Sequence, residues 1–529
     1  YARLAGSTAF TAKQTIVEML RESGDLVGDV RPVKHPVKFF EKGDKPLEIV
    51  TTRQWYLRNG GRDQLLRERL LARGAELRWH PSNMEIRYQN WVSGLNGDWL
   101  ISRQRFFGVP FPLWYELDAN GEPRYDQPLL PEDDQLPIDP QSDTPAGFTE
   151  DQRGVAGGFA GDPDVMDTWA TSSLSPEIAG KWTIDDDLFQ RVFPMDLRPQ
   201  AHEIIRTWLF STVVRADAEF GTLPWTDAAI SGWILDPDRK KMAKSKGNVV
   251  TPAAMLEEHG SDALRYWAAS GRPGTDTAFD IGQMKIGRRL AIKILNASKF
   301  VFGVGVGPAL AFDASAVTEP IDRALLARLA DVVEDATRSF DDYNYTRALE
   351  SAETFFWSFT DDYLELVKER AYGGRGDAAA RSARVTLATA MSVIHRLFAP
   401  VLPFVTEEVW SWWQEGSIHR MVWPSADDVR AIAGDGDSAV LDAAGRVLSQ
   451  LRKVKSENKV SMRTELAAAR VSGPDAALAE RAADDLRASG RIVGDLTFAA
   501  GDSDEPGVSV TLAPPDALPA PPAPPAPPA

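Results

Sequence analysis

The most informative stretch of this chain is DRKKMAKSKGN, at residues 238–248. Five lysines and arginines fall within residues 239–246, and a glycine follows. The stretch lies between a predicted strand that ends at Leu235 and a predicted helix that begins after Pro252. Such a loop, at the carboxyl end of an α/β strand, is where these sheets bind ligands. Its ammonium groups can neutralise a polyphosphate, whereas a solvated basic loop is the competing interpretation.

Strand-like and helical runs alternate on both sides of this loop. Residues 46–283 mix strands, such as 229–235, with helices and Gly/Pro-rich stretches, which predicts an α/β domain with insertions. The Pro-, Asp- and Gly-rich segment 116–164 is expected to be a long surface excursion. From residue 284 the apolar spacing becomes three and four, which is typical of amphipathic helices that pack on one another. Residues 284–435 are therefore predicted to form an all-α bundle.

Smaller units are predicted at the two ends of the chain. Residues 1–45 read as a helix followed by short strands, and the chain opens with Tyr1 rather than Met. We expect this opening to lie in the middle of a longer polypeptide. Residues 436–512 contain helical runs and a strand-like end, which predicts a small α/β unit. Residues 513–529 are almost entirely Pro and Ala and are expected to form an extended, disordered tail.

Composition excludes several classes of protein and site. The chain has no cysteine, so disulfides, cysteine nucleophiles and thiolate zinc sites are excluded, and its six histidines are scattered. We therefore expect no resident metal. No apolar run approaches the roughly 18 residues of a membrane-spanning helix, so we expect a cytoplasmic protein with no membrane partner. A net charge of −17 argues against a nonspecific coat on DNA.

Two basic clusters stand out from this acidic background. The first lies in a stretch without an acid and contains Lys285, Arg288, Arg289 and Lys293. The second runs from residue 446 to residue 463 with one acid in it, and includes Lys453, Lys455 and Lys459. Focused cations on an acidic protein can steer a polyanion to chosen surfaces. Solvated helix faces are the competing interpretation for each cluster taken alone.

The sequence of residues 238–248 resembles the KMSKS signature of the class I aminoacyl-tRNA synthetases. In that family the carboxylate of an amino acid attacks the α-phosphorus of ATP, and the aminoacyl group then passes to tRNA. The resemblance implies that Lys241 and Lys244 stabilise the leaving pyrophosphate, and that Lys244 and Ser245 bind ATP. It also implies ATP with Mg²⁺ as the substrate complex, and no zinc. Ala243 stands where the family usually has serine, from which we expect a modest effect on loop dynamics.

Further blocks match the family in the right order. The sequence NGDWLISRQRFFG at residues 96–108 looks like the block that follows the editing insertion of the valine, isoleucine and leucine enzymes. The sequence RPQAHEII at 198–205 is similar to the block that contacts the ATP ribose, which implies ATP-binding roles for His202 and Glu203. The sequence FAPVLPFVTEEVW at 398–410 looks like the helix break of the anticodon-binding bundle.

The amino acid is indicated by one block, DTWATSS at residues 167–173, which resembles the valine-specific members of the family. The resemblance implies that the side-chain pocket is walled by Trp169, Val165 and an aromatic ring at Phe106 or Phe107. Aromatic walls limit the volume of a pocket and so exclude larger aliphatic side chains by steric clash. An ordinary core tryptophan is the competing interpretation of Trp169.

The resemblance covers nearly the whole chain to about residue 470. It implies the second half of a Rossmann-type class I catalytic core, an all-α anticodon-binding bundle and a small C-terminal α/β unit, with residues 1–45 as the end of the editing insertion. The family's HIGH motif is absent from these 529 residues. We therefore expect a partial, valine-specific chain that is inactive alone, and a monomer. Its expected partners are valine, ATP and tRNA(Val), with both basic clusters touching the tRNA.

Two other functions stay open from the sequence. An isoleucine-specific member of the same family would differ in which amino acid drives ATP–pyrophosphate exchange. A noncatalytic tRNA-binding protein would keep the bundle and lose the chemistry. The intact lysines at 241 and 244 argue against this second alternative, because a binding module has no use for them.

Overall fold

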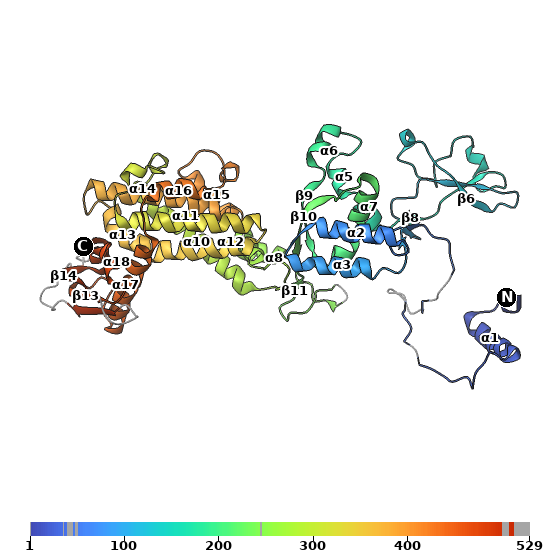
Figure 1. Ribbon diagram of the computed structural model, residues 1–529, viewed down its shortest axis with the longest axis horizontal. Helices are drawn as coiled ribbons and strands as arrows, with labels where there is room; N and C mark the ends of the chain where they lie inside the picture. The colour runs from blue at the N-terminus through green and yellow to red at the C-terminus, as the bar shows by residue number, and fades with distance from the viewer. Residues whose placement is uncertain are drawn as a thin grey trace, which may run out of the picture. The chain divides into compact units, whose positions relative to one another are not determined.

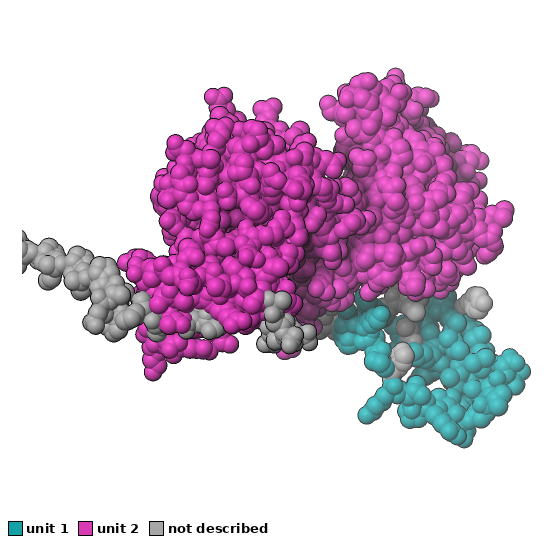
Figure 2. Space-filling model, turned by 60° about the vertical axis from the view of Figure 1, so that its left-hand side comes forward, with its two compact units in different colours: residues 1–55 teal, residues 56–529 magenta. Residues whose placement is uncertain are grey.

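A computed structural model of the chain describes residues 2–34, 36–39, 46–47, 51–243, 246–499 and 507–512. The chain divides into two compact units, residues 1–55 and residues 56–529 (Figure 2). None of the described helices is both long enough and apolar enough to cross a lipid bilayer.

Unit 1 contains the 3₁₀ turn η1 (Ala2–Leu4) and the helix α1 (Ala9–Ser23). The hydroxyl of Thr8 caps the start of α1 by accepting a backbone N–H hydrogen bond, and Gly24 ends the helix with a φ of 78°. The helix predicted here is confirmed. The strands predicted near residues 37–40 lie partly outside the described residues.

The first part of unit 2 mixes short strands and helices, as predicted for an α/β domain (Figure 1). Its strands are β1 (Tyr56–Leu57), β2 (Arg78–His80), β3 (Trp99–Leu100), β4 (Ser102–Arg103), β5 (Trp114–Leu117), β6 (Pro123–Leu129), β7 (Phe159–Gly161), β8 (Val165–Met166), β9 (Met195–Ala201), β10 (Trp225–Ser231), β11 (Ile234–Leu235) and β12 (Thr277–Ala278). Its α-helices are α2 (Gln64–Glu76), α3 (Glu85–Ser93), α4 (Thr168–Ser172), α5 (Ser175–Ala179), α6 (Asp186–Val192), α7 (Phe210–Phe220), α8 (Ala253–His259) and α9 (Ser261–Ala269). Shorter turns are η2 (Ser82–Met84), η3 (Asp133–Gln135), η4 (Glu150–Gln152), η5 (His202–Ile204) and the π-helical η6 (Ile205–Leu209).

Three parallel strands form the sheet that positions the cationic loop, in the order β2-β10-β9. The chain returns from β9 to β10 through η5, η6 and α7, the helical crossover that parallel strands require. β10 and β9 pair to their last residues, with Ser231 opposite Ala201. The segments that follow these two strands therefore start side by side, at the carboxyl edge of the sheet.

One hydrophobic core fixes this sheet against α2, α3 and α7. It takes side chains from each of these elements, among them Leu70, Trp79, Tyr88, Val213 and Ala228. The ring of Tyr88 fits because residue 74 is glycine, where a Cβ would lie 2.4 Å from the ring. Close packing of this kind makes the sheet a rigid support for the loops at its edge.

The segment predicted to be a surface excursion has a small sheet of its own, with the antiparallel order β6-β5-β7. Trp114 is buried at its centre and donates its indole N–H to the carbonyls of Pro140 and Asp143. The Tyr115 hydroxyl donates to the buried carboxylate of Asp162. This excursion is therefore ordered around aromatic side chains, despite a composition typical of loops.

Helices dominate the rest of unit 2 (Figure 1). The bundle is built from α10 (Ile281–Gly303), α11 (Pro320–Asp341), α12 (Tyr345–Ser358), α13 (Leu364–Ala371), α14 (Asp377–Phe398), α15 (Pro403–Ser411) and α16 (Ala426–Ala433), with η8 (Pro308–Leu310), η9 (Ala314–Ala316), the π-helical η10 (Phe359–Tyr363) and η11 (Ile418–Arg420) between them. The C-terminal part contains α17 (Ser438–Glu457), β13 (Leu466–Ser472), α18 (Ala476–Glu480), α19 (Ala483–Gly490), β14 (Ile492–Ala499) and β15 (Gly507–Leu512).

α11 lies at the centre of the bundle and packs on α12, α14, α16 and α17. Its buried face repeats every four residues, at Ile321, Leu325, Leu329 and Val333, which confirms the predicted helical period. The hydrophobic core does not end at the predicted boundary near residue 435. Side chains of α17, α19 and β14 belong to the same cluster as the bundle, so the C-terminal α/β part extends the bundle's core.

A buried group of charges also holds the C-terminal part to the bundle. Arg370 on α13 is 0% exposed. Its guanidinium donates to Asp322 on α11 at 2.6 Å and to Asp485 on α19 at 3.0 Å. Burial acts to lower the pKa of Arg370, but the Asp322 carboxylate outweighs it and raises that pKa. The arginine therefore stays charged and ties three helices together.

We predict that Arg370→Met destabilises the chain by about 3–5 kcal/mol, because it leaves the buried Asp322 carboxylate without its cation and Asp485 paired with Arg375 alone. Urea unfolding followed by circular dichroism measures the change. The matched control is Arg338→Met, which removes an exposed arginine paired with Asp335 and should leave the midpoint nearly unchanged. Equal effects of the two substitutions would contradict a supporting role for the buried group.

Candidate functional site

The cationic stretch begins as a tight hairpin after β11. The backbone N–H of Asp236 donates to the carbonyl of Lys240 at 2.9 Å, and Leu235 forms a bridge with Lys241. Arg239 turns the chain with a φ of 62°. This turn sends residue 241 back toward the strand ends from which the loop starts.

Asn248 closes the loop by contacting both of its sides. Its amide oxygen accepts the backbone N–H of Ala243 at 2.9 Å, and its amide nitrogen donates to Asp236 at 2.7 Å. Hydrogen bonds, first from the backbone N–H of Lys240 and then from Asn248, lower the pKa of Asp236. Lys244 and Ser245, for which ATP contacts are predicted, lie outside the described residues.

Lys241 reaches across to the end of β9. Its ammonium lies 2.8 Å from the carboxylate of Glu203 and 4.0 Å from the ring centre of Trp233. The hydrogen bond from Lys241 lowers the pKa of Glu203. Both side chains are about half exposed, at 49% and 40%, and such a pair contributes at most about 1 kcal/mol. A polyphosphate with several anionic oxygens can therefore displace Glu203 from the ammonium.

His202 is joined to the same site through Asp276. The imidazole lies 3.4 Å from the Asp276 carboxylate, which also accepts the backbone N–H of Trp233 at 2.8 Å. The His202 ring lies 4.7 Å from that of Trp233. Gly232 allows this close approach, since a Cβ there would lie 2.1 Å from the carbonyl of Thr275. The structure thus brings together Lys241, His202 and Glu203, as predicted residues of one site.

Sequence analysis did not identify Trp233, Asp276 or Asn248 as residues of the site. A signal existed for Trp233, because a glycine and an aromatic residue directly precede the strand that leads into the loop. Nothing in the spacing of Asp276, which is 28 residues beyond Asn248, indicated a contact with His202. Such contacts are set by how separate segments meet at the sheet edge.

The block at residues 167–173, predicted to select the amino acid, contacts the block at residues 96–108 directly. β8 pairs antiparallel with β4, and the carboxylate of Asp167 accepts the indole N–H of Trp99 and the guanidinium of Arg103 at 3.2 and 2.9 Å. Asp167 also caps α4, which carries Trp169. Trp169 is only partly buried and belongs to neither hydrophobic core, which argues against the core interpretation.

The other predicted pocket residues differ in their surroundings. Val165 is buried against Gly108, where a Cβ would lie 2.6 Å from the valine. Phe106 and Phe107 are 92% and 85% exposed, with their rings edge to face at 4.9 Å. Exposed rings enclose no ligand in this conformation, so their place in a pocket stays a prediction.

The two basic clusters meet on one side of the bundle. Asp361 on η10 accepts the ammonium of Lys293 on α10 at 2.9 Å, and its backbone carbonyl accepts the guanidinium of Arg452 on α17 at 2.9 Å. Lys285 and Arg289 are exposed along α10. Arg288 is also exposed and donates to the carbonyl of Glu258 at 2.8 Å. A contact through Asp361 thus places two distant clusters beside each other.

A cavity of about 540 Å³ opens beside the second cluster, between α13, α17 and α19. Two acids, Glu365 and Glu369, line it. Its cations outnumber them and are Lys368, Arg452, Lys455, Arg463 and Arg491. Tyr372 at its edge is largely exposed. An excess of cations beside an exposed aromatic ring suits a nucleic-acid strand.

Lys455 requires a correction. It is 3% exposed, and its ammonium donates to the carbonyls of Met462 and Gly490 at 3.1 and 2.8 Å. Burial lowers the pKa of this lysine. The prediction that Lys455 contacts tRNA is wrong in this fold, because its donors already serve the backbone. Lys453 and Lys459 are exposed on either side of it.

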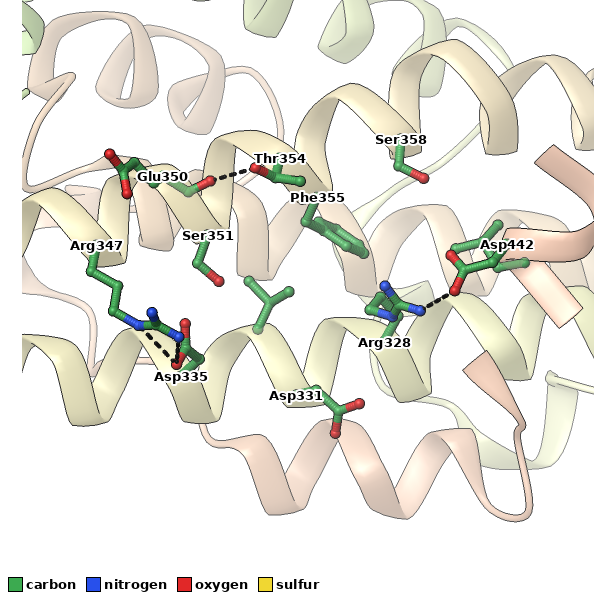
Figure 3. A pocket seen from close by; sticks show the side chains of 12 residues that line it. Arg328, Asp331, Asp335, Arg347, Glu350, Ser351, Thr354, Phe355, Ser358 and Asp442 are labelled. Carbon is green, nitrogen blue, oxygen red and sulfur yellow. Dashed lines mark hydrogen bonds and ion pairs between the residues drawn. The ribbon is translucent and has the colours of Figure 1, made fainter. Parts of the chain in front are cut away.

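A second cavity of about 540 Å³, between α11, α12 and α17, has the opposite charge balance (Figure 3). Its acids are Asp331, Asp335, Glu350 and Asp442. Its two arginines are already paired, Arg328 with Asp442 and Arg347 with Asp335 (Figure 3). A polyanion is not expected to bind there. Among the described residues, no group of three or more His, Asp or Glu side chains is placed to hold a metal ion.

Two family models match the chain. Residues 21–280 match the model described as tRNA synthetases class I (I, L, M and V). Residues 322–471 match the model of the anticodon-binding domain of tRNA ligase. The helical bundle and the α/β part thus correspond to two separately recognised domains.

Curated relatives and a solved structure are also similar to the chain. The valine–tRNA ligase of Thermobifida fusca is 65% identical over 97% of this chain and 58% of its own length. That of Salinispora tropica is 62% identical over 93% and 59%. The chain thus spans about three fifths of these relatives. The LeuRS of Agrobacterium radiobacter K84, solved with tRNA and LeuAMS, aligns with a TM-score of 0.50 at 19% identity, over 64% of this chain and 43% of that one; this likeness concerns the fold.

We predict that Asn248→Ala speeds hydrogen exchange of the Ala243 backbone N–H about three- to tenfold, because that N–H loses its acceptor. Hydrogen exchange with mass spectrometry of the 529-residue chain measures it. The control is Asn120→Ala, in the turn between β5 and β6. Unchanged exchange at residue 243 would show that Asn248 does not close the loop.

Proposed function

Because the chain belongs to the class I tRNA synthetases of the I, L, M and V group, we propose that it is a large part of a valine–tRNA ligase. The proposed reaction is ATP-dependent activation of valine to valyl-adenylate and transfer of the valyl group to tRNA(Val). Relatives named for this activity, at 53–65% identity over most of the chain, support it. A monomer in the cytoplasm is part of the proposal.

The contact between Lys241 and Glu203 is the observation that carries the proposal. It joins the KMSKS-like loop to the block that resembles the ATP-ribose site, at the sheet edge where α/β folds bind nucleotides. When valine attacks the α-phosphorus, negative charge gathers on the leaving pyrophosphate. Lys241, together with Lys244, would stabilise that charge as it develops. Once Lys241 turns to phosphate, Glu203 is free to bind the ribose beside His202, and the ATP brings Mg²⁺ as substrate.

Valine is proposed to lie against α4. Trp169 is partly exposed there, and the nearby Val165 packs on Gly108. Phe106 or Phe107 would complete the wall by moving against the bound amino acid. An aromatic wall of fixed position rejects larger aliphatics because they have no room.

The tRNA is proposed to contact the bundle along the side where the two basic clusters meet. The proposed contacts are Lys285, Arg288, Arg289, Lys293, Lys453 and Lys459. Their support is exposure, or in the case of Lys293 partial exposure, and the cation excess of the neighbouring cavity. Lys293 would exchange Asp361 for a phosphate.

We predict that Lys241→Ala, in the full-length enzyme, slows valine-dependent ATP–pyrophosphate exchange by about 10²- to 10³-fold, because a cation is lost where charge develops. The matched control is Lys240→Ala. Its ammonium is exposed and lies 3.5 Å from Asp238, in the same loop.

The control should keep exchange within about twofold of the unmodified enzyme. Both variants should bind tRNA(Val) unchanged. If Lys241→Ala kept its exchange rate and lost tRNA affinity, the loop would serve RNA binding instead of phosphate chemistry.

We predict that the double substitution Lys453→Ala with Lys459→Ala weakens binding of tRNA(Val) to the 529-residue chain. The slope of log K against log salt should fall by about 1.5, because each phosphate contact contributes about 0.7–0.9. Fluorescence anisotropy over a salt series measures both quantities. The control, Lys181→Ala with Lys240→Ala, removes two exposed lysines elsewhere and should keep the slope. An unchanged slope in the Lys453→Ala, Lys459→Ala variant would reject this surface as a tRNA contact.

A further inference from the structure

α4 is too short to hold Trp169 in place by itself. It has five residues, and helices of that length are unstable alone because nucleation is unfavourable. Its last carbonyls have no intrahelical partner. The position of Trp169 must therefore come from hydrogen bonds that surrounding elements make to the two ends of α4.

Side chains from η6 and α7 hold the C-terminal end of α4. The indole N–H of Trp208 donates to the carbonyl of Ser172 at 2.9 Å. The guanidinium of Arg215 donates to the hydroxyl of Ser173 at 2.8 Å and to the carbonyl of Ala170 at 3.3 Å. Ser173 is completely buried, so water does not replace these donors.

Trp208 is itself fixed to the sheet. The guanidinium of Arg198 on β9 lies over the ring of Trp208. The same guanidinium lies 5.1 Å from the ring centre of Trp225 on β10. Arg198 is four residues before His202 on the same strand and turn. One continuous segment, residues 195–209, thus contacts the predicted ATP side through Glu203 and the predicted amino-acid side through Trp208.

We propose that Trp208 and Arg215 are positioning residues that set amino-acid specificity, by fixing the C-terminal end of α4 and with it the Trp169 wall. The inference rests on the proposed function and goes beyond it, because neither residue touches the amino acid. A wall held at both ends keeps the pocket volume constant. If the C-terminal hydrogen bonds are lost, α4 shifts, the pocket widens, and valine binds less well while isoleucine fits better.

The test compares Trp208→Phe and Ser173→Ala in the full-length enzyme by ATP–pyrophosphate exchange. Trp208→Phe keeps an aromatic ring for Arg198 but removes the donor to Ser172. Ser173→Ala removes only a hydroxyl, so it keeps the inference testable if the first variant fails to fold. Each should raise KM for valine about fivefold, lower the valine-to-isoleucine ratio of kcat/KM, and leave KM for ATP unchanged. Arg215→Lys, which retains one donor, should raise KM for valine by less than either of these variants. The control is Arg191→Met, an exposed arginine on α6 paired with Asp187.

The outcomes separate this inference from the proposed function. If the unmodified enzyme catalyses no valine-dependent exchange, the proposed function fails before any variant is compared. If it does, and the variants change KM for ATP as much as KM for valine, the residues are general supports and the inference is overturned. The inference would also be overturned if the variants left both KM for valine and the valine-to-isoleucine ratio of kcat/KM unchanged.

Discussion

The parallel pairing of β9 with β10 is the constraint on which the candidate site depends. The two strands stay in register to Ala201 and Ser231, so the residues that follow them begin about one strand spacing apart. Glu203 and Trp233 are therefore neighbours, and the loop that returns to them brings Lys241 within 2.8 Å of the carboxylate. A shift of one residue in this register would turn the strand faces over and separate these groups.

Helix α9 of the α/β part is attached to the bundle through polar contacts at a helix break. Asp262 on α9 accepts the backbone N–H groups of Phe404 and Val405 at the start of α15, at 3.1 and 2.8 Å. Arg265 donates to the carbonyl of Pro400 at 2.7 Å. Prolines in the break remove backbone donors. Side chains of α9 form hydrogen bonds with backbone N–H and carbonyl groups that remain unpaired at the break. α9, the second helix after the cationic loop, is thus tied to the domain proposed to bind tRNA.

Buried and exposed cations have different roles in this chain. The group around Arg370 is buried and structural, and it joins helices that apolar packing already brings together. Lys455 is similar, since its ammonium serves backbone carbonyls. Other cations of α10 and α17 are partly or fully exposed, and Lys293 and Arg452 among them both contact Asp361. Only these exposed cations can exchange their partners for phosphate at a low cost in free energy.

The helical bundle, the α/β class and the cationic loop could be predicted from the amino-acid sequence, because hydrophobic period, composition and sequence motifs are local properties. The sequence indicated Lys241, His202 and Glu203 separately, through their motifs. Tertiary structure alone decided that these three meet, that Asp276 and Trp233 join them, and that Lys455 is buried while Lys453 is exposed. The reason is physical: contacts between residues far apart in the chain depend on strand register and helix packing, which no single stretch of sequence encodes.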